Sequence, residues 1–89
     1  MSSAGMTIRE VLEANGRLPV SAMTLRDDDD LYQNGLSSHA SVNVMLGLEN
    51  AFDVEFPDEL LRRDTFKSVA AIEAALTTLG AHVQSDANG

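Results

Sequence analysis

Ser37 and Ser38 are adjacent hydroxyl-bearing residues at the point where the sequence predicts the start of a helix. They follow a polar turn that ends in Gly35-Leu36, and the apolar residues after them repeat at helical spacing as far as Ala51. At a helix N-terminus the first backbone N–H groups lack partners within the helix, and the macrodipole is positive. A serine there has two interpretations: it caps the helix, or its hydroxyl is an attachment point for a phosphate that the helix end stabilises.

A serine–histidine catalytic pair is the next chemistry to consider, because His39 follows Ser38 directly. Adjacent residues on a helix do not face each other, and the other histidine, His82, lies in a polar C-terminal segment. No Gly-x-Ser-x-Gly motif surrounds either serine. We therefore expect no enzymatic activity, and we expect His39 to face solvent or a partner protein. The chain also has no cysteine, so any thioester chemistry requires a thiol on a prosthetic group.

A run of four aspartates, residues 27–30, could be read as a metal site. If an EF-hand loop began at Asp30, Gly35 would fall at the sixth position, as that motif requires. Tyr32 would then stand at the third position and Ser41 at the twelfth, where a bidentate Glu is needed. Starting the loop earlier in the run loses the glycine. We predict no metal site and expect a solvated acidic surface, with one carboxylate capping the following turn.

Composition and charge narrow the fold class and the partners. The 89 residues suit one domain, and the apolar 44% is mainly aliphatic, with one Tyr, three Phe and no Trp, which favours a helical bundle. A formal charge of −8 argues against nucleic acid or an anionic membrane as a ligand, since both select basic surfaces. No segment has the apolar length of a membrane span, and no signal peptide is evident. We expect a cytoplasmic protein.

The pattern predicts an all-α fold of four antiparallel helices, three long and one short, with a long loop between the first two. We expect flexible residues 1–6, a domain over residues 7–79 and a disordered tail over residues 80–89. Thr7 and Glu10 fit a capping box for a first helix that ends at Asn15. The second helix is predicted from about Ser38 to Ala51 and the last from Phe66, capped by Thr65, to Leu79. Between them, Pro57-Asp58-Glu59 is a good helix start, and a helix of one or two turns follows through Leu60–Arg63.

Two segments resemble the acyl and peptidyl carrier proteins. Leu31-Tyr32-Gln33-Asn34-Gly35-Leu36-Ser37-Ser38 is similar to the region before their modified serine, which typically reads Asp-Leu-Phe, a few residues, and Leu-Gly-Leu-Asp-Ser-Leu. Leu48-Glu49-Asn50-Ala51-Phe52-Asp53-Val54-Glu55-Phe56-Pro57-Asp58-Glu59 is similar to their Leu-Glu-Glu-Glu-Phe-Gly-Ile-Glu-Ile-Pro-Asp-Glu and is the more specific match. The spacing between the segments also matches, so the resemblance covers about residues 7–79. It implies that Ser38 carries a 4′-phosphopantetheine arm, transferred from coenzyme A by a phosphopantetheinyl transferase.

The resemblance also implies roles for the neighbours of Ser38. Gly35, Leu36 and Ser37 would shape the turn that exposes the serine, although Ser37 stands where the family usually has Asp, and His39 where it usually has Leu. Apolar residues of the following segments would lie near the arm or its cargo, or form plain core: Val42, Met45, Leu46, Val54, Phe56 and Leu61.

The distribution of charged residues bears on how a partner recognises the predicted second helix, and on what the arginines before the last helix contact. The second helix carries one charged residue, Glu49, so we expect a partner to recognise the Asn43 face by shape and hydrogen bonds. Arg62 and Arg63 are the densest positive charge in the chain. We expect them to balance a helix end or nearby carboxylates, with contact to the arm's phosphate as the alternative.

The cargo is the most open part of the prediction. Gly-Leu-Ser-Ser-His and a nearly uncharged second helix resemble the stand-alone bacterial carriers that amino acid:carrier-protein ligases load. This implies a small amino acid held as a thioester. One alternative is an acyl carrier protein for fatty-acid, lipid or polyketide assembly, served by acyl-transfer enzymes. A third is a helical adaptor that binds proteins and is never modified.

Overall fold

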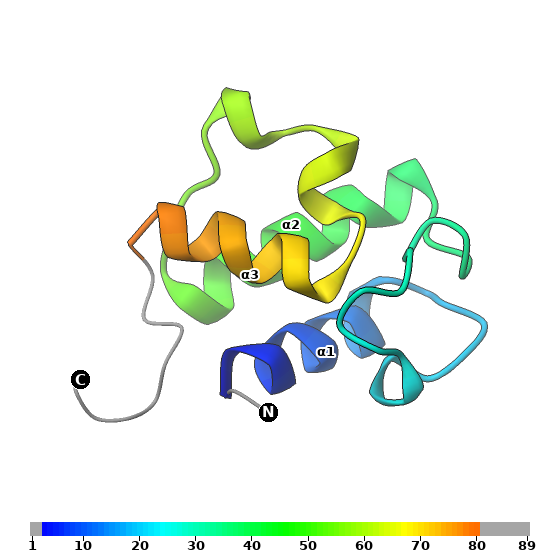
Figure 1. Cartoon of the computed structure of the whole chain (residues 1–89). Coiled ribbons are helices and arrows are strands. Elements are labelled where there is room, and N and C mark those ends of the chain that lie inside the picture. The colour runs from blue at the N-terminus through cyan, green and yellow to red at the C-terminus, as the bar shows by residue number, and fades with distance from the viewer. Residues whose placement is uncertain (1–2, 81–89) are drawn as a thin grey trace.

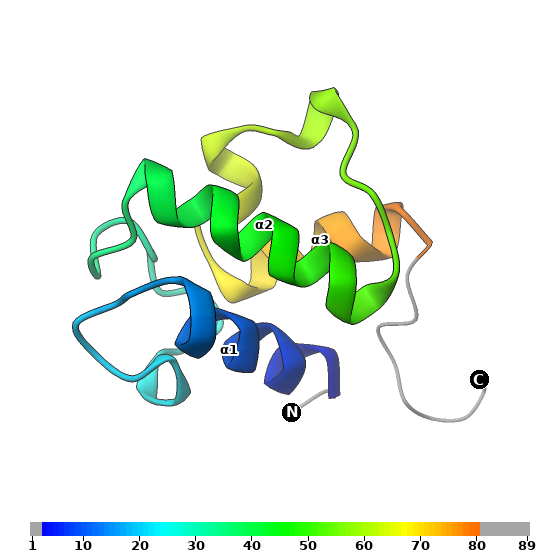
Figure 2. The same ribbon diagram turned by 180° about the vertical axis from the view of Figure 1, so that it is seen from behind.

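Three α-helices form the regular structure of residues 3–80, the part of the chain that this computed structural model describes. They are α1 (Ser3–Asn15), α2 (Ser38–Phe52) and α3 (Val69–Thr78). Three short 3₁₀ turns lie between them: η1 (Ala22–Thr24), η2 (Asp58–Leu60) and η3 (Arg63–Phe66). α1 packs against both other helices, as the front and back views show (Figures 1 and 2). Within the described residues there is no strand, and no helix is both long and apolar enough to cross a membrane.

The core is aliphatic, as the composition predicts. Each helix contributes a pair of fully buried residues four positions apart, which is the spacing of one helix face. The pairs are Ile8 and Leu12 in α1, Val44 and Leu48 in α2, and Ile72 and Leu76 in α3. Val69 at the start of α3 and Leu31 in the turn before α2 are also fully buried. The predicted all-α fold is therefore confirmed. Its expected fourth helix over Leu60–Arg63 is not, because η2 and η3 occupy that region.

Two helix starts differ from the prediction. α1 begins at Ser3 rather than Thr7, so the predicted capping box lies inside the helix. Ala4 is buried, so the additional N-terminal turn contains a residue that is removed from solvent. α3 begins at Val69 rather than Phe66, with Ser68 as its N-cap in place of Thr65. The predicted disorder after residue 80 lies outside the described residues.

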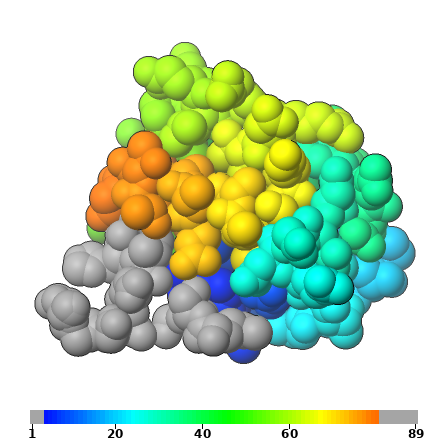
Figure 3. Space-filling model, viewed as in Figure 1, coloured from blue at the N-terminus to red at the C-terminus, as the bar shows by residue number. Residues whose placement is uncertain are grey.

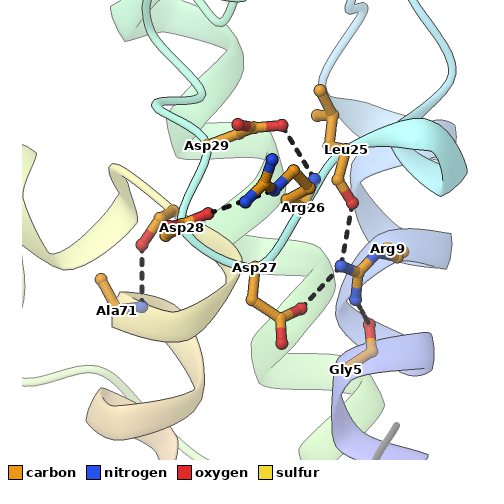
Figure 4. Close-up of polar contacts among 9 residues, drawn as sticks. Gly5, Arg9, Leu25, Arg26, Asp27, Asp28, Asp29 and Ala71 are labelled. Atoms are coloured by element: carbon orange, nitrogen blue, oxygen red, sulfur yellow. Dashed lines mark hydrogen bonds and ion pairs between the residues drawn. The ribbon is translucent and has the colours of Figure 1, made fainter.

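A buried arginine holds the long connection between α1 and α2 against α1. Arg9 is only 3% exposed, and its Nη2 donates to the Leu25 carbonyl at 3.0 Å and to Asp27 Oδ1 at 2.6 Å (Figure 4). Its Nη1 donates to the Gly5 carbonyl at 3.3 Å. The aspartate run is therefore more than a solvated surface, since Asp27 fixes the loop to the first helix.

The same connection is fastened to the start of α3 by backbone hydrogen bonds. Leu31 N donates to Lys67 O at 2.7 Å, and Ala70 N donates to Asp27 O at 2.9 Å. In the space-filling view the connection (cyan) and the segments around η3 and α3 (yellow to orange) share one face of the molecule (Figure 3). These contacts set the position of residues 31–37, which lead into α2.

Candidate functional site

The two serines at the start of α2 have different roles. Ser37 is the N-cap, with extended backbone angles, and its Oγ accepts a hydrogen bond from Ala40 N at 3.0 Å. Ser38 is the first helical residue and is exposed. Among residues 3–80, no hydrogen bond engages the Ser38 Oγ, although its carbonyl accepts one from Ser41 Oγ. The capping interpretation therefore belongs to Ser37, which leaves the Ser38 hydroxyl available for chemistry.

A tight turn, residues 31–36, lies immediately before the two serines, and Ser38 is exposed at the surface. Gly35 has φ 112°, a conformation that favours glycine, and a Cβ at this position would collide with the ring of Pro19. Leu36 is buried, and its N–H donates to the Leu31 carbonyl at 2.9 Å. The turn is thus closed by its own backbone and anchored in the core immediately before the two serines.

An open cavity of about 410 Å³ lies beside Ser38. Three segments form its wall: the turn before α2, the first two turns of α2, and the stretch from Leu61 to Phe66. Ser38, Ser41, Val42 and Met45 share one face of α2, because their spacing is three and four. The remaining lining residues are Tyr32, Leu61, Arg62, Arg63 and Phe66.

The predicted cargo-facing residues divide into two groups. Val42, Met45 and Leu61 line the cavity, and about half of the Val42 and Leu61 surface is exposed (51% and 45%). Phe56 is core instead, with its ring centroid 5.4 Å from that of Phe66. Phe66, which sequence reasoning placed in the last helix, takes part in the cavity wall.

Other predicted residues lie outside the cavity wall. Val54 is partly buried and packs against the core. Leu46 is half exposed, Asn43 is half-buried, and His39 is exposed, so each of these α2 side chains reaches the protein surface. The Glu49 carboxylate accepts a hydrogen bond from Phe56 N at 2.9 Å, which ties the one charged side chain of α2 to the loop that follows the helix.

Arg62 and Arg63 line the same cavity as Ser38. Arg63 Cζ lies 3.9 Å from the centroid of the Tyr32 ring, a cation–π contact. Within residues 3–80 neither arginine is paired with a carboxylate, since the ion pairs there join Arg9 with Asp27 and Arg26 with Asp28. The expected balance with nearby carboxylates is therefore absent within ion-pair distance, whereas the expected balance of a helix end stays a prediction, with Arg63 lying in the 3₁₀ turn η3. Sequence reasoning raised contact with the arm's phosphate only as an alternative, from the resemblance, and had no signal for the fold that places both arginines in the wall of the cavity that Ser38 also lines.

The chain is similar to carrier proteins of known name and structure. An aminoacyl carrier protein from Agrobacterium fabrum strain C58 is 58% identical over 67 residues, which cover 75% of this chain and 81% of that relative. A chain in the crystal structure of engineered Bradyrhizobium japonicum glycine:carrier protein ligase complexed with carrier protein from Agrobacterium tumefaciens and AMP gives a TM-score of 0.80. Its identity is 53%, over 82% of this chain and 97% of that chain.

A more distant likeness points the same way. A chain in the crystal structure of Bradyrhizobium japonicum glycine:carrier protein ligase complexed with glycylated carrier protein gives a TM-score of 0.70 at 28% identity. The match covers 81% of this chain and 96% of that chain. No protein-family model matches the sequence. The chain is therefore similar, at 53% and at 28% identity, to chains in structures of a carrier protein complexed with glycine:carrier protein ligase.

Proposed function

The chain belongs to the aminoacyl carrier protein family, and we propose that it holds an aminoacyl group as a thioester on a 4′-phosphopantetheine arm attached to Ser38. The observation that carries this proposal is the exposed Ser38 hydroxyl at the edge of the cavity, left without a hydrogen bond because Ser37 caps α2. The protein then serves as a non-catalytic carrier. Its cytoplasmic location stays a prediction.

The residues present fit such an arm. In the transfer from coenzyme A, the Ser38 Oγ forms a bond to phosphorus, the pyrophosphate bond breaks so that adenosine 3′,5′-bisphosphate leaves, and the hydroxyl proton is released. An exposed Oγ with no internal hydrogen bond can enter that reaction without breaking a native contact. The chain has no cysteine, so the arm supplies the thiol that a thioester needs.

A loading enzyme of the amino acid:carrier-protein ligase class is the proposed partner, because the relatives include carrier proteins complexed with glycine:carrier protein ligase. The surface of α2 suits a partner that reads shape and hydrogen bonds. Val42 and Leu46 are about half exposed, Asn43 reaches the surface, and the Glu49 carboxylate is engaged internally. A small amino acid is the proposed cargo, and a phosphopantetheinyl transferase attaches the arm.

The test has two stages. The first is the intact mass of the protein after incubation with coenzyme A and the transferase of its own host, with Ser38→Ala as the unmodified control. We expect a gain of one phosphopantetheinyl group, mapped to Ser38 by peptide fragmentation. A protein that stays unmodified would be an adaptor, and the proposal would fail.

The second stage compares ATP-dependent loading of amino acids and of fatty acids onto the modified protein by the corresponding ligases. We expect a small amino acid to be loaded as a hydroxylamine-sensitive thioester. Loading of fatty acids alone would show instead an acyl carrier protein for lipid or polyketide assembly.

A further inference from the structure

We propose that Arg62 and Arg63 bind the phosphate of the arm on Ser38 and so hold the attached end of the arm at the cavity. This inference rests on the proposed function, because it concerns the group that Ser38 would carry. It goes further by assigning a phosphate site to two residues outside the serine motif. The two arginines and the serine line one cavity, although 24 to 25 positions separate them in the sequence.

The distribution of charge singles out this pair. The chain has 6 basic residues against 14 acidic ones, so positive charge is scarce. Arg9 is buried on Asp27, and the Arg26 Nε lies 3.9 Å from Asp28 Oδ1. Arg62 and Arg63, by contrast, are exposed at the cavity and have no carboxylate within ion-pair distance in the described part of the chain. Arg17 and Lys67 also have no ion pair within residues 3–80, but they do not line the cavity, so Arg62 and Arg63 are the basic residues that share its wall with Ser38.

The backbone and one aromatic ring fix where this pair lies. The Arg62 carbonyl accepts a hydrogen bond from Thr65 N at 3.1 Å, and Thr65 is buried, so η3 is fastened to the core. The Arg63 guanidinium lies over Tyr32, a half-buried residue of the turn that leads to Ser38. A stacked guanidinium is already ordered, so less conformational entropy is lost when it binds.

The chemistry of the side chains matches a phosphodiester. A guanidinium presents a planar set of N–H donors that can bind two phosphate oxygens at once. The phosphorus would be bonded directly to the Ser38 Oγ, so the phosphate would lie beside a residue that shares the cavity wall with the two arginines. With the phosphate held there, the rest of the arm can lie along the apolar wall formed by Val42, Met45 and Leu61.

Nuclear magnetic resonance on the modified protein, without any partner, tests this proposal. The first measurement compares the arginine Nε–Hε signals of the unmodified and modified wild-type protein. We expect the Arg62 and Arg63 signals to shift on modification, while the signal of Arg17 stays in place. The second measurement is the ³¹P chemical shift of the arm. In the Arg62→Gln/Arg63→Gln variant it should move toward the value of the urea-unfolded modified protein.

Lys67→Gln is the matched control, because it removes one positive charge from an exposed side chain next to η3 that does not line the cavity. It should leave the ³¹P shift unchanged. Unchanged arginine signals on modification would overturn the proposal. This comparison uses only the wild-type protein, so misfolding of a variant could not explain such a result. Signals that respond only when a ligase is added would assign the pair to the partner interface. Failure of Ser38 to be modified would remove this inference and the proposed function together, whereas modification without an arginine response removes this inference alone.

Discussion

Replacing Ser37 and Ser38 one at a time should separate the stability of α2 from the attachment of the arm. Ser37→Ala removes the hydrogen bond from Ala40 N to the Ser37 Oγ, at 3.0 Å, and leaves that N–H without its cap. Loss of a serine N-cap costs about 1 kcal/mol of stability. For a domain of this size that corresponds to a fall in melting temperature of about 4–8 °C. The Ser38 hydroxyl is untouched, so this variant should still accept the arm.

Ser38→Ala should give the opposite pattern. Its hydroxyl makes no hydrogen bond within the described residues, and alanine is the best helix former, so the free energy of unfolding should change by less than about 0.5 kcal/mol. Modification should be abolished. Ser37→Asp is a useful third variant, because aspartate caps a helix as well as serine does and favours the positive pole. It should retain wild-type stability and keep the attachment site.

Thermal and urea unfolding, followed by circular dichroism on the unmodified proteins, measures the first property. Intact mass after reaction with coenzyme A and the transferase measures the second. The reasoning fails if Ser38→Ala is destabilised as much as Ser37→Ala, since Ser38 would then be a structural residue. It also fails if a folded Ser37→Ala protein is no longer modified, or if the arm maps to Ser37 in the wild type.

Three further variants test the parts that position the site. Gly47→Ala should lower the free energy of unfolding by about 1–3 kcal/mol, because a Cβ would lie 2.8 Å from Val11 Cγ1 on α1. This loss should outweigh the better helix propensity of alanine. An increase in the urea midpoint would contradict this prediction. Arg9→Met should cost about 2–3 kcal/mol, since a buried guanidinium bonded to Asp27 and two carbonyls is lost; a loss under 0.5 kcal/mol in urea unfolding would show that the loop is held elsewhere. Asn43→Glu should slow loading by the cognate ligase several-fold without changing the melting temperature, because it puts a charge on a neutral face of α2; an unchanged kcat/KM would remove this face from recognition.

Sequence patterns predicted the parts of the fold that depend on local periodicity. The aliphatic stripe of α2 contains the buried residues Ala40, Val44 and Leu48, and the helix starts at the predicted Ser38. The exposed first residue and its cap follow from the preference of serine for that position. The sequence left open which serine caps. Local patterns also give no reason for a glycine inside α2; a Cβ at Gly47 would lie 2.8 Å from Val11 Cγ1 of α1, so the glycine allows the two helices to pack closely.

Residues whose environment depends on distant segments were predicted poorly. Nothing in the sequence indicated that Arg9 is buried, because its partners are the Leu25 carbonyl, 16 residues later, and the Asp27 carboxylate, 18 residues later. Two 3₁₀ turns, η2 and η3, occupy the region where a short helix was expected after Pro57. Phe66, the expected first residue of the last helix, belongs to η3, and α3 begins at Val69. Local capping rules cannot weigh such tertiary contacts, which is why both helix starts were misplaced.

The same limit explains why the site was only half predicted. The Ser38 hydroxyl and its turn lie within a few consecutive residues, so sequence reasoning could find them. The cavity wall opposite α2 comes from Leu61–Phe66, whose position is set by η3 and by the stacking of Arg63 on Tyr32. That stacking joins the turn before Ser38 to the segment before α3, so the two arginines share a cavity with the proposed attachment point because of the fold rather than proximity in the sequence. A carrier with so acidic a composition gains from this arrangement, because positive charge is concentrated where a phosphate would be attached.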